Sequence, residues 1–218
     1  MKADDWCRVL FYFYYSLLIM YNPYDFYFKK AKKEGFKARS VYKLEEIDRK
    51  YKIFTKTTRN VLDIGCAPWS WIQYIWKRMQ DLWVKNFKIL GFDLKETNLN
   101  LPGVYTYAQD ATQLDKVEDI LKNHDIKSFD VITSDMAPNT IGIKDIDAIR
   151  SVNLLEKTLP IYEKFLKPDG RFVIKVFMGP KFDEFVKKIK SLFWWKKIKI
   201  FKPQATRKNS KEVYVIRY

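Results

Sequence analysis

The sequence predicts an α/β fold in which one seven-stranded, mostly parallel sheet carries helices on both faces. Short apolar runs of strand length alternate with longer segments of helical periodicity, as expected when a crossover helix follows each strand. The first such run, residues 60–64, is followed by a glycine turn and a helix-like segment. The 218 residues are 47% hydrophobic and contain no Pro/Gly/Ser-rich linker, which favours a single core.

Two helices are expected before the first strand. The first runs from Pro23 to Lys33 and ends at Gly35, because glycine readily adopts the left-handed backbone that ends helices. The second runs from Ser40 to Lys50, with the Ser40 hydroxyl as the expected N-cap.

Strands and helices then alternate to the end of the chain. We expect strands at Asn60–Ile64, Phe87–Asp93, Val104–Gln109, Phe129–Ser134, Arg171–Phe177, Ile198–Phe201 and Glu212–Arg217. We expect helices at Trp71–Gln80, Leu114–Asn123, Asp147–Leu166 and Lys181–Phe193. The last two strands are joined only by residues 202–211, which is too short for a crossover helix. The sheet should therefore end in an antiparallel hairpin.

The charge of the chain favours a polyanionic partner. Lys and Arg number 41 against 26 Asp and Glu, a formal net charge of +15. Clustered cations gain affinity by releasing counterions from phosphates, so nucleic acid is the first expectation and an anionic membrane surface the second. Cys7 and Cys66 lie in unrelated contexts, which indicates a reducing, cytoplasmic setting with no disulfide framework and no metal site.

We expect two parts in the chain, an amino-terminal leader at residues 1–20 and a domain at residues 21–218. Its apolar run from Val9 to Met20 is shorter than the roughly 20 residues that span a bilayer, and no signal-peptide cleavage site follows it. We rank three explanations: a start assigned upstream of the true start at Met20, an added helix packed on the domain, and a membrane anchor.

The turn after the first strand predicts a nucleotide-sized site. Asp63 and Gly65 lie where an α/β sheet binds a dinucleotide or S-adenosylmethionine. The G-x-G-x-x-G spacing of dinucleotide folds is absent. Asp-x-Gly followed by Ala-Pro and an aromatic residue favours a methyltransferase that uses S-adenosylmethionine.

Five segments in order carry a more specific pattern, and together they resemble the FtsJ/RrmJ family of ribosomal RNA 2′-O-methyltransferases over residues 21–218. They are Ala38–Asp48, Leu62–Pro68, Ser134–Thr140, Phe172–Phe177 and Arg207–Tyr214. The resemblance implies a Rossmann-like domain that methylates a ribose 2′-hydroxyl, in the bacterial branch on a uridine of large-subunit rRNA. We expect a monomer acting on an assembled particle. A methyltransferase acting on tRNA or a cap, and an RNA-binding assembly factor without activity, are the alternatives.

The resemblance places Lys43, Asp135, Lys175 and Glu212 on the catalytic Lys-Asp-Lys-Glu tetrad of the family. The 2′-hydroxyl must lose its proton while its oxygen attacks the sulfonium methyl in line. Lysine accepts a proton only when neutral, and its free pKa of about 10.4 falls beside another ammonium or on desolvation.

Lys175 is our expected base, because a lysine inside an apolar strand is rare unless it is paired or functional. Asp135 and Glu212 would orient the two lysines, and Lys43 would orient the ribose or stabilise the developing alkoxide. Without the family pattern, Lys43 would be interpreted as part of a solvated helix face.

The expected cofactor is S-adenosylmethionine. Asp93 ends the second strand, where a carboxylate can accept both ribose hydroxyls of the cofactor. Asp110 resembles the family's acidic residue near the adenine, although an N-cap carboxylate is the alternative. The resemblance places the cofactor-binding residues at Gly65, Ala67, Pro68, Trp71, Asp93, Asp110 and Asp135.

Trp69 departs from the family pattern, which has glycine after Ala-Pro. An indole there should either fill the cofactor pocket or adopt an unfavourable φ. The explanations are a natural loss of activity, a tolerated outward indole, or a UGA codon that means glycine but is translated as tryptophan. We favour the last, because the chain has seven Trp against seven Gly, and Trp83 and Trp194-Trp195 could share this origin.

Basic residues gather near two members of the tetrad, as expected if RNA phosphates cross the site. One group is Lys29, Lys30, Lys32, Lys33, Lys37 and Arg39, and the other is Lys202, Arg207, Lys208 and Lys211. A solvated helix face would explain either group alone. The single histidine, His124, is expected to be a surface residue.

Overall fold

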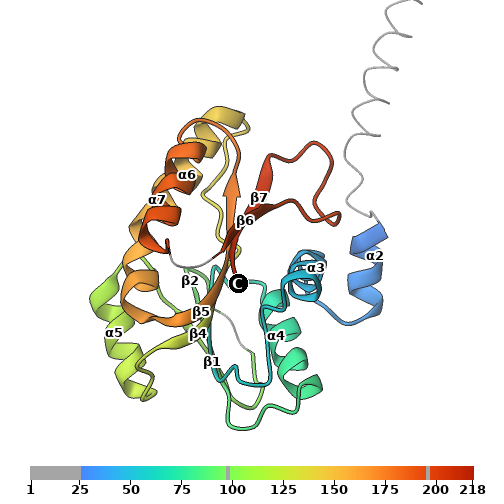
Figure 1. Ribbon diagram of the computed structural model, residues 1–218. Helices are drawn as coiled ribbons and strands as arrows, with labels where there is room; N and C mark the ends of the chain where they lie inside the picture. The colour runs from blue at the N-terminus through green and yellow to red at the C-terminus, as the bar shows by residue number, and fades with distance from the viewer. Residues whose placement is uncertain (1–25, 97–98, 195–196) are drawn as a thin grey trace, which may run out of the picture.

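The computed structural model describes residues 26–96, 99–194 and 197–218, so the leader and Trp195 lie outside the described residues. It confirms the α/β class, with a seven-stranded sheet in the order β3-β2-β1-β4-β5-β7-β6 (Figure 1). The strands are β1 (Asn60–Ile64), β2 (Lys88–Asp93), β3 (Val104–Ala108), β4 (Phe129–Ser134), β5 (Leu166–Phe177), β6 (Ile198–Phe201) and β7 (Glu212–Arg217).

The sheet is parallel from β3 through β5 and antiparallel at its other end. Strands β1, β2, β3, β4 and β5 pair parallel with their neighbours, whereas β7 lies antiparallel between β5 and β6. The expected terminal hairpin is therefore confirmed. Because β7 runs opposite to β5, Glu212 at its start pairs with Phe177 at the end of β5.

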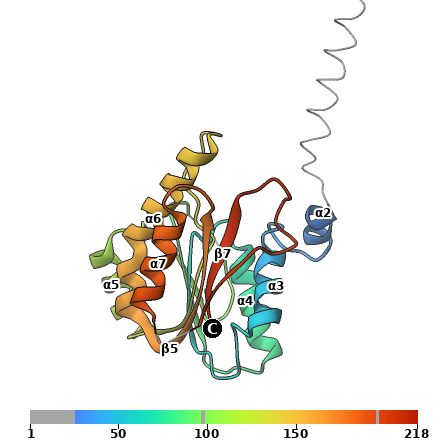
Figure 2. The same ribbon diagram turned by 45° about the horizontal axis from the view of Figure 1, so that its top comes forward.

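Helices cover both faces of the sheet, as expected (Figure 2). One face carries α3 and α4, and the other carries α5, α6 and α7, with a large apolar core between each layer and the sheet. The helices are α2 (Phe26–Lys33), α3 (Val41–Tyr51), α4 (Ser70–Asp81), α5 (Leu114–Asn123), α6 (Lys144–Phe165) and α7 (Phe182–Leu192). Within the described ranges, no helix combines the length and apolar character needed to cross a bilayer.

Three local expectations are wrong. Ser40 precedes α3 but makes no side-chain cap, because its hydroxyl lies 2.9 Å from the hydroxyl of Ser70. Helix α6 begins before Asp147, whose carboxylate accepts hydrogen bonds from the upstream loop. Strand β5 begins at Leu166, since the turn-like residues after it form an irregularity within the pairing with β4.

Candidate active site

A cavity of about 440 Å³ opens where β1, β2 and β4 end. The strand order reverses between β1 and β4, and open α/β sheets bind their ligands at such a switch point. The lining includes six of the residues expected from the sequence: Gly65, Ala67, Asp93, Asp110, Asp135 and Lys175. Residues expected from both the cofactor site and the tetrad thus share one cavity.

Gly65 allows the chain to turn sharply at the end of β1. Its φ is +76°, and a Cβ there would lie 2.7 to 2.9 Å from atoms of Met136. Only glycine fits this approach without a shift of the neighbouring loop. The turn then directs the Ala67 N–H to the Asp93 carboxylate, with N and Oδ2 2.9 Å apart.

Asp93 is held in place by backbone donors. Oδ2 accepts the Ala67 N–H, and Oδ1 accepts the Lys95 N–H at 3.0 Å. The side chain is partly exposed in the cavity. Each carboxylate oxygen can accept more than one hydrogen bond, so this fixed carboxylate retains acceptor capacity for a diol.

Asp110 also lines the cavity, at the start of the loop before α5. Its Oδ1 accepts hydrogen bonds from the Thr112 N–H and hydroxyl, both at 2.8 Å. Gln113 occupies the N-cap position of α5, so the alternative N-cap role for Asp110 is wrong.

Pro68 and Trp71 are not among the residues that line the cavity. Trp71 is buried, and its indole N–H donates to the Ser40 carbonyl at 2.9 Å. Its ring also packs against Tyr214, with centroids 5.9 Å apart. In this structure Trp71 supports α3 and β7 from behind the site.

The four expected tetrad residues come from four elements and form two ion pairs. Lys43 of α3 lies 2.7 Å from Glu212 at the start of β7. Lys175 of β5 lies 3.0 Å from the carboxylate of Asp135, which follows β4, and also donates to the Asp135 carbonyl. Both pairs are largely shielded from solvent, which strengthens their attraction.

Tyr214 joins the two ion pairs, and we did not predict it from the sequence. Its hydroxyl lies 2.8 Å from Glu212 Oε1 and 3.2 Å from Asp135 Oδ1. Complete burial and the two neighbouring carboxylates raise the pKa of Tyr214 well above its usual value, so the hydroxyl keeps its proton. The sequence feature that could have revealed Tyr214 is its position two residues after Glu212, because alternate residues of a strand share a face.

The carboxyl ends of the strands are acidic. Burial raises the pKa of Asp63 to about 8, and the charges of Asp135 and Asp93 add to the shift. The Thr133 hydroxyl donates to Asp63 at 2.7 Å. The carboxylates that line the cavity itself, those of Asp93, Asp110 and Asp135, favour a cationic ligand over an anionic one.

One arginine from each of the two basic groups expected from the sequence lies close to the other, Arg39 and Arg207. The Arg39 guanidinium donates to the carbonyl of Ala205 at 2.5 Å, which fastens the β6–β7 loop to the start of α3. Burial and the nearby Arg207 lower the pKa of Arg39, whereas Glu212 acts in the opposite direction. Two guanidiniums from distant segments thus lie near each other, and that of Arg39 also lies near the tetrad carboxylate of Glu212.

Trp69 lies outside the cavity lining and has a left-handed backbone, with φ +61° and ψ 19°. Its indole is partly buried against the core below α4, and the Lys37 ammonium lies 5.7 Å from the ring centroid. Trp83 has φ +56° just after α4, and its side chain is 86% exposed. Both tryptophans adopt a backbone that glycine favours.

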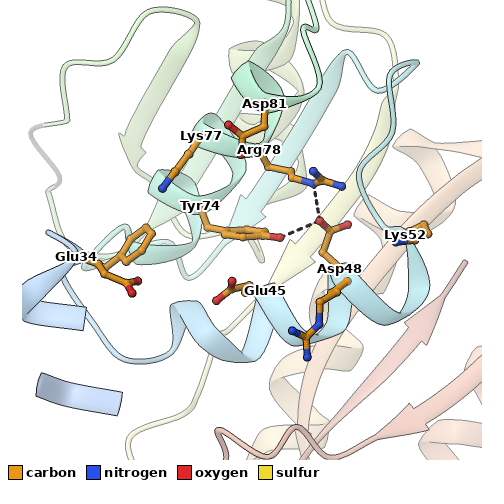
Figure 3. A pocket seen from close by; sticks show the side chains of 10 residues that line it. Glu34, Glu45, Asp48, Lys52, Tyr74, Lys77, Arg78 and Asp81 are labelled. Carbon is orange, nitrogen blue, oxygen red and sulfur yellow. Dashed lines mark hydrogen bonds and ion pairs between the residues drawn. The ribbon is translucent and has the colours of Figure 1, made fainter. Parts of the chain in front are cut away.

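A second cavity, of about 300 Å³, lies between α3 and α4 (Figure 3). Figure 3 shows Asp48 between Tyr74 and Arg78, and its carboxylate accepts hydrogen bonds from both at 2.8 and 2.9 Å. Asp48 is 1% exposed and also accepts the Phe54 N–H. These contacts satisfy the buried carboxylate and hold the two helices together. None of the expected site residues lines this cavity.

His124 lies away from both cavities, at the end of α5. Its ring is 4.2 Å from that of Tyr105, and Nε2 is hydrogen-bonded to the Tyr107 hydroxyl. Across the described part of the chain, His, Cys, Asp and Glu residues form no group of three or more that could hold a metal ion.

Comparisons with known proteins identify one family. The sequence model of the FtsJ-like methyltransferases matches residues 36–218. The chain is 43% identical over 197 residues to the ribosomal RNA large subunit methyltransferase E of Bdellovibrio bacteriovorus, covering 90% of this chain and 96% of the relative. Its identity to the protein of the same name from Desulfatibacillum aliphaticivorans is 44% over 193 residues, 88% of each chain.

Solved structures agree with this result. A ribosomal RNA methyltransferase from Plasmodium falciparum superposes with a TM-score of 0.67 at 27% identity, over 84% of this chain and 97% of that one. A TehB-like methyltransferase from Corynebacterium glutamicum, at 17% identity and a TM-score of 0.51 over 87% and 92% of the two chains, shows the same fold.

Proposed function

The chain belongs to the FtsJ-like methyltransferase family, and from this premise we propose that it methylates the ribose 2′-hydroxyl of a uridine in large-subunit ribosomal RNA. One observation carries the proposal. Asp135 and Lys175 line the cavity, and Tyr214 connects this pair to Glu212 and Lys43. The relatives named above as large-subunit methyltransferases support this choice of RNA.

S-adenosylmethionine is the cofactor that fits the cavity. The volume of about 440 Å³ lies in the range of small-molecule sites. The fixed carboxylate of Asp93 would accept the ribose hydroxyls, and Asp110 lies in the same lining for the adenine side. The acidic strand ends suit a cofactor whose reactive sulfur is positively charged. When bound, the cofactor supplies an electrophilic methyl group.

Lys175 is the proposed base. Its ammonium nitrogen lies in the cavity lining, held by the carboxylate and the carbonyl of Asp135. In its neutral form, Nζ would take the proton from the ribose 2′-hydroxyl, whose oxygen would accept the methyl group that a bound cofactor would supply. Asp135 then stabilises the resulting ammonium.

Lys43 is proposed to position the ribose and to stabilise the oxygen as negative charge develops on it. Its partner Glu212 keeps the ammonium directed toward the site from α3, and Tyr214 fixes Glu212 relative to Asp135. The two lysines are therefore held at a set separation by a continuous chain of hydrogen bonds.

The RNA backbone is proposed to cross the basic side of the site. Arg207 lies close enough to Arg39 to lower the pKa of its guanidinium, and a phosphate bound between the two would relieve this repulsion. The exposed lysines of α2 and of the β6–β7 loop extend this side. Phosphate contacts of this kind orient an RNA without reading its bases.

Trp69 is proposed to leave the cofactor cavity open. Its absence from the cavity lining favours the enzyme over the alternative of an RNA-binding assembly factor without activity. Outward placement of the indole is supported by its contact with Lys37.

We further propose a cytoplasmic monomer that works on an assembled large subunit without a bound metal ion. The domain would comprise residues 21–218, with the leader as a separate segment. Light scattering coupled to gel filtration would test the oligomeric state, and a chain that begins at Met20 would test whether the leader is needed.

The test is methyl transfer from labelled S-adenosylmethionine to large subunits purified from a strain that lacks the ribose methylation. Parallel reactions would contain naked large-subunit rRNA or bulk tRNA. Nucleoside analysis should yield 2′-O-methyluridine from large subunits. Label in tRNA alone would support the tRNA alternative, and cofactor binding without any transfer would overturn the proposal.

A further inference from the structure

An exposed apolar segment lies beside the candidate active site and takes no part in the chemistry described above. The isoleucine segment, residues 139–146, joins β4 to the first turn of α6 and is exposed along its whole length. Ile141, Ile143 and Ile146 are 50%, 55% and 39% exposed. Single exposed apolar residues are common, but three within six positions are typical of a binding surface.

The backbone of this segment is fixed by a buried carboxylate. Asp147 is 7% exposed, and its two oxygens accept the Ile141 N–H at 2.9 Å and the Gly142 N–H at 3.1 Å. The Arg150 guanidinium donates to the Asn139 carbonyl at 3.4 Å. The isoleucines are therefore presented to solvent on a constrained loop, which lowers the entropic cost of binding a ligand.

The segment extends from the cofactor cavity to the tetrad. Asn139 is part of the cavity lining. At the other end Asp145 forms an ion pair with Lys211 at 3.0 Å, and Lys211 directly precedes Glu212. The Met178 N–H donates to the Lys211 carbonyl at 2.8 Å, and the Met178 side chain is 45% exposed.

The two sides of the site differ in charge. Figure 2 shows the first turns of α6 above the strand ends on one side and the β6–β7 loop on the other. The loop side carries Arg39, Arg207 and Lys208. The isoleucine segment contains only Lys144 and Asp145 as charged residues, and Asp145 is paired. Phosphates should favour the first side and an uncharged flat group the second.

We propose that the isoleucine segment receives the nucleobase of the nucleotide whose ribose is methylated. This inference rests on the proposed function. The base is bonded to the carbon next to the one that bears the 2′-hydroxyl, so a ribose beside Lys175 places its base at the wall of the site. A base taken from an RNA stack loses apolar contacts, and the isoleucines and Met178 replace them.

The first experiment compares the double variant Ile141→Ser/Ile143→Ser with Ile200→Ser, a control that changes an isoleucine 44% exposed on β6. The substrate is unmethylated large subunits. The double variant should raise KM for the subunits about tenfold and leave the Kd of S-adenosylmethionine within twofold of the unchanged chain. The control should change neither. An unchanged KM in the double variant would overturn the proposal.

The second experiment uses the unchanged chain and so does not depend on the folding of variants. Unmethylated large subunits are reassembled with rRNA that carries 4-thiouridine at the nucleotide that the wild-type reaction methylates. Irradiation should crosslink it to a peptide within residues 139–150, and crosslinks only to α2 or the β6–β7 loop would contradict the inference.

A raised KM in the double variant without a crosslink to residues 139–150 in the unchanged chain would assign the segment to a ribosomal protein and also overturn the inference. Failure of the proposed function looks different, because no RNA would then be methylated by the unchanged chain.

Discussion

The cofactor cavity and the tetrad lie at the same end of the sheet but are assembled from different kinds of contact. The cofactor side joins consecutive parallel strands, and backbone N–H groups fix its key carboxylate, Asp93. The tetrad joins α3 to β4, β5 and β7 through side chains, with Tyr214 between its two ion pairs. Changes on the first side should alter cofactor affinity, whereas changes on the second should alter the rate.

The largest expected effect is on the tetrad side. Lys175→Ala removes the proposed base, and general bases contribute about 10²- to 10⁴-fold to rate. We expect methyl transfer to large subunits to fall about a thousandfold in single-turnover assays. A rate within tenfold of the unchanged chain would show that another group takes the proton.

Asp93→Ala should produce the largest effect on the cofactor side. The loss of charge-assisted hydrogen bonds to two ribose hydroxyls, about 1.5–3 kcal/mol each, should weaken cofactor binding at least tenfold. Transfer at saturating cofactor should stay within a fewfold of normal. Isothermal titration measures the cofactor Kd, and saturation kinetics measure the rate of transfer. A fall in rate without a change in Kd would contradict the assignment of Asp93 to cofactor affinity.

Tyr214→Phe tests the connection between the ion pairs. The substitution keeps the ring but removes the hydroxyl that contacts the buried carboxylate of Glu212 and the partly exposed carboxylate of Asp135, so we expect transfer to fall about tenfold and stability by about 1–2 kcal/mol. Cofactor Kd should not change. Phe201→Leu, outside the site, provides a stability control, and rates equal to wild type in Tyr214→Phe would show that the link has no catalytic importance.

The smallest effects are expected on stability, at Trp69 and Trp83, whose backbones are left-handed. Trp83→Gly should raise the free energy of unfolding by about 1 kcal/mol, because a bulky residue is strained there and its side chain is exposed. Trp69→Gly should stabilise less, since the partly buried indole also loses core contacts. Denaturant titration measures both changes, and destabilisation by Trp83→Gly would contradict the argument.

Trp69 and Trp83 also bear on the hypothesis that a UGA codon meaning glycine is translated as tryptophan. Both positions have the backbone expected of glycine, which supports the proposal that UGA is translated here as tryptophan. A UGG codon at position 69 would rule it out. The mass of the protein purified from its natural source would identify the residues that the organism inserts.

Much of the fold follows from local sequence. The strand β1 and the turn at Gly65 were predictable because apolar runs and glycine conformations act within a few residues. The first residues of α6 and β5 were not predictable. Asp147 accepts a hydrogen bond from the loop before it instead of starting α6, and β5 includes a turn-like sequence near its start. The start of α6 depends on side-chain bonds that hydrophobic periodicity does not show, and the start of β5 depends on pairing with β4, which a local pattern does not contain.

The site was predictable to a similar degree. The pairing of Lys43 with Glu212 spans most of the chain, so periodicity alone could not have revealed it and the family motifs were needed. The last motif ends at Tyr214, but our prediction gave this residue no role in the site, although its spacing from Glu212 was visible. Trp69 adopts the unfavourable φ that was one of the two outcomes expected for it, and the sequence could not decide between them because the choice depends on packing of the indole against the core.

The most direct test of the two-sided account is the titration of S-adenosylmethionine into Lys175→Ala. If the cofactor side sets affinity and the tetrad sets rate, the Kd should stay within threefold of the unchanged chain while transfer is lost. A Kd that rises in proportion to the lost rate would contradict the account, because Lys175 would then hold the cofactor instead of taking the proton.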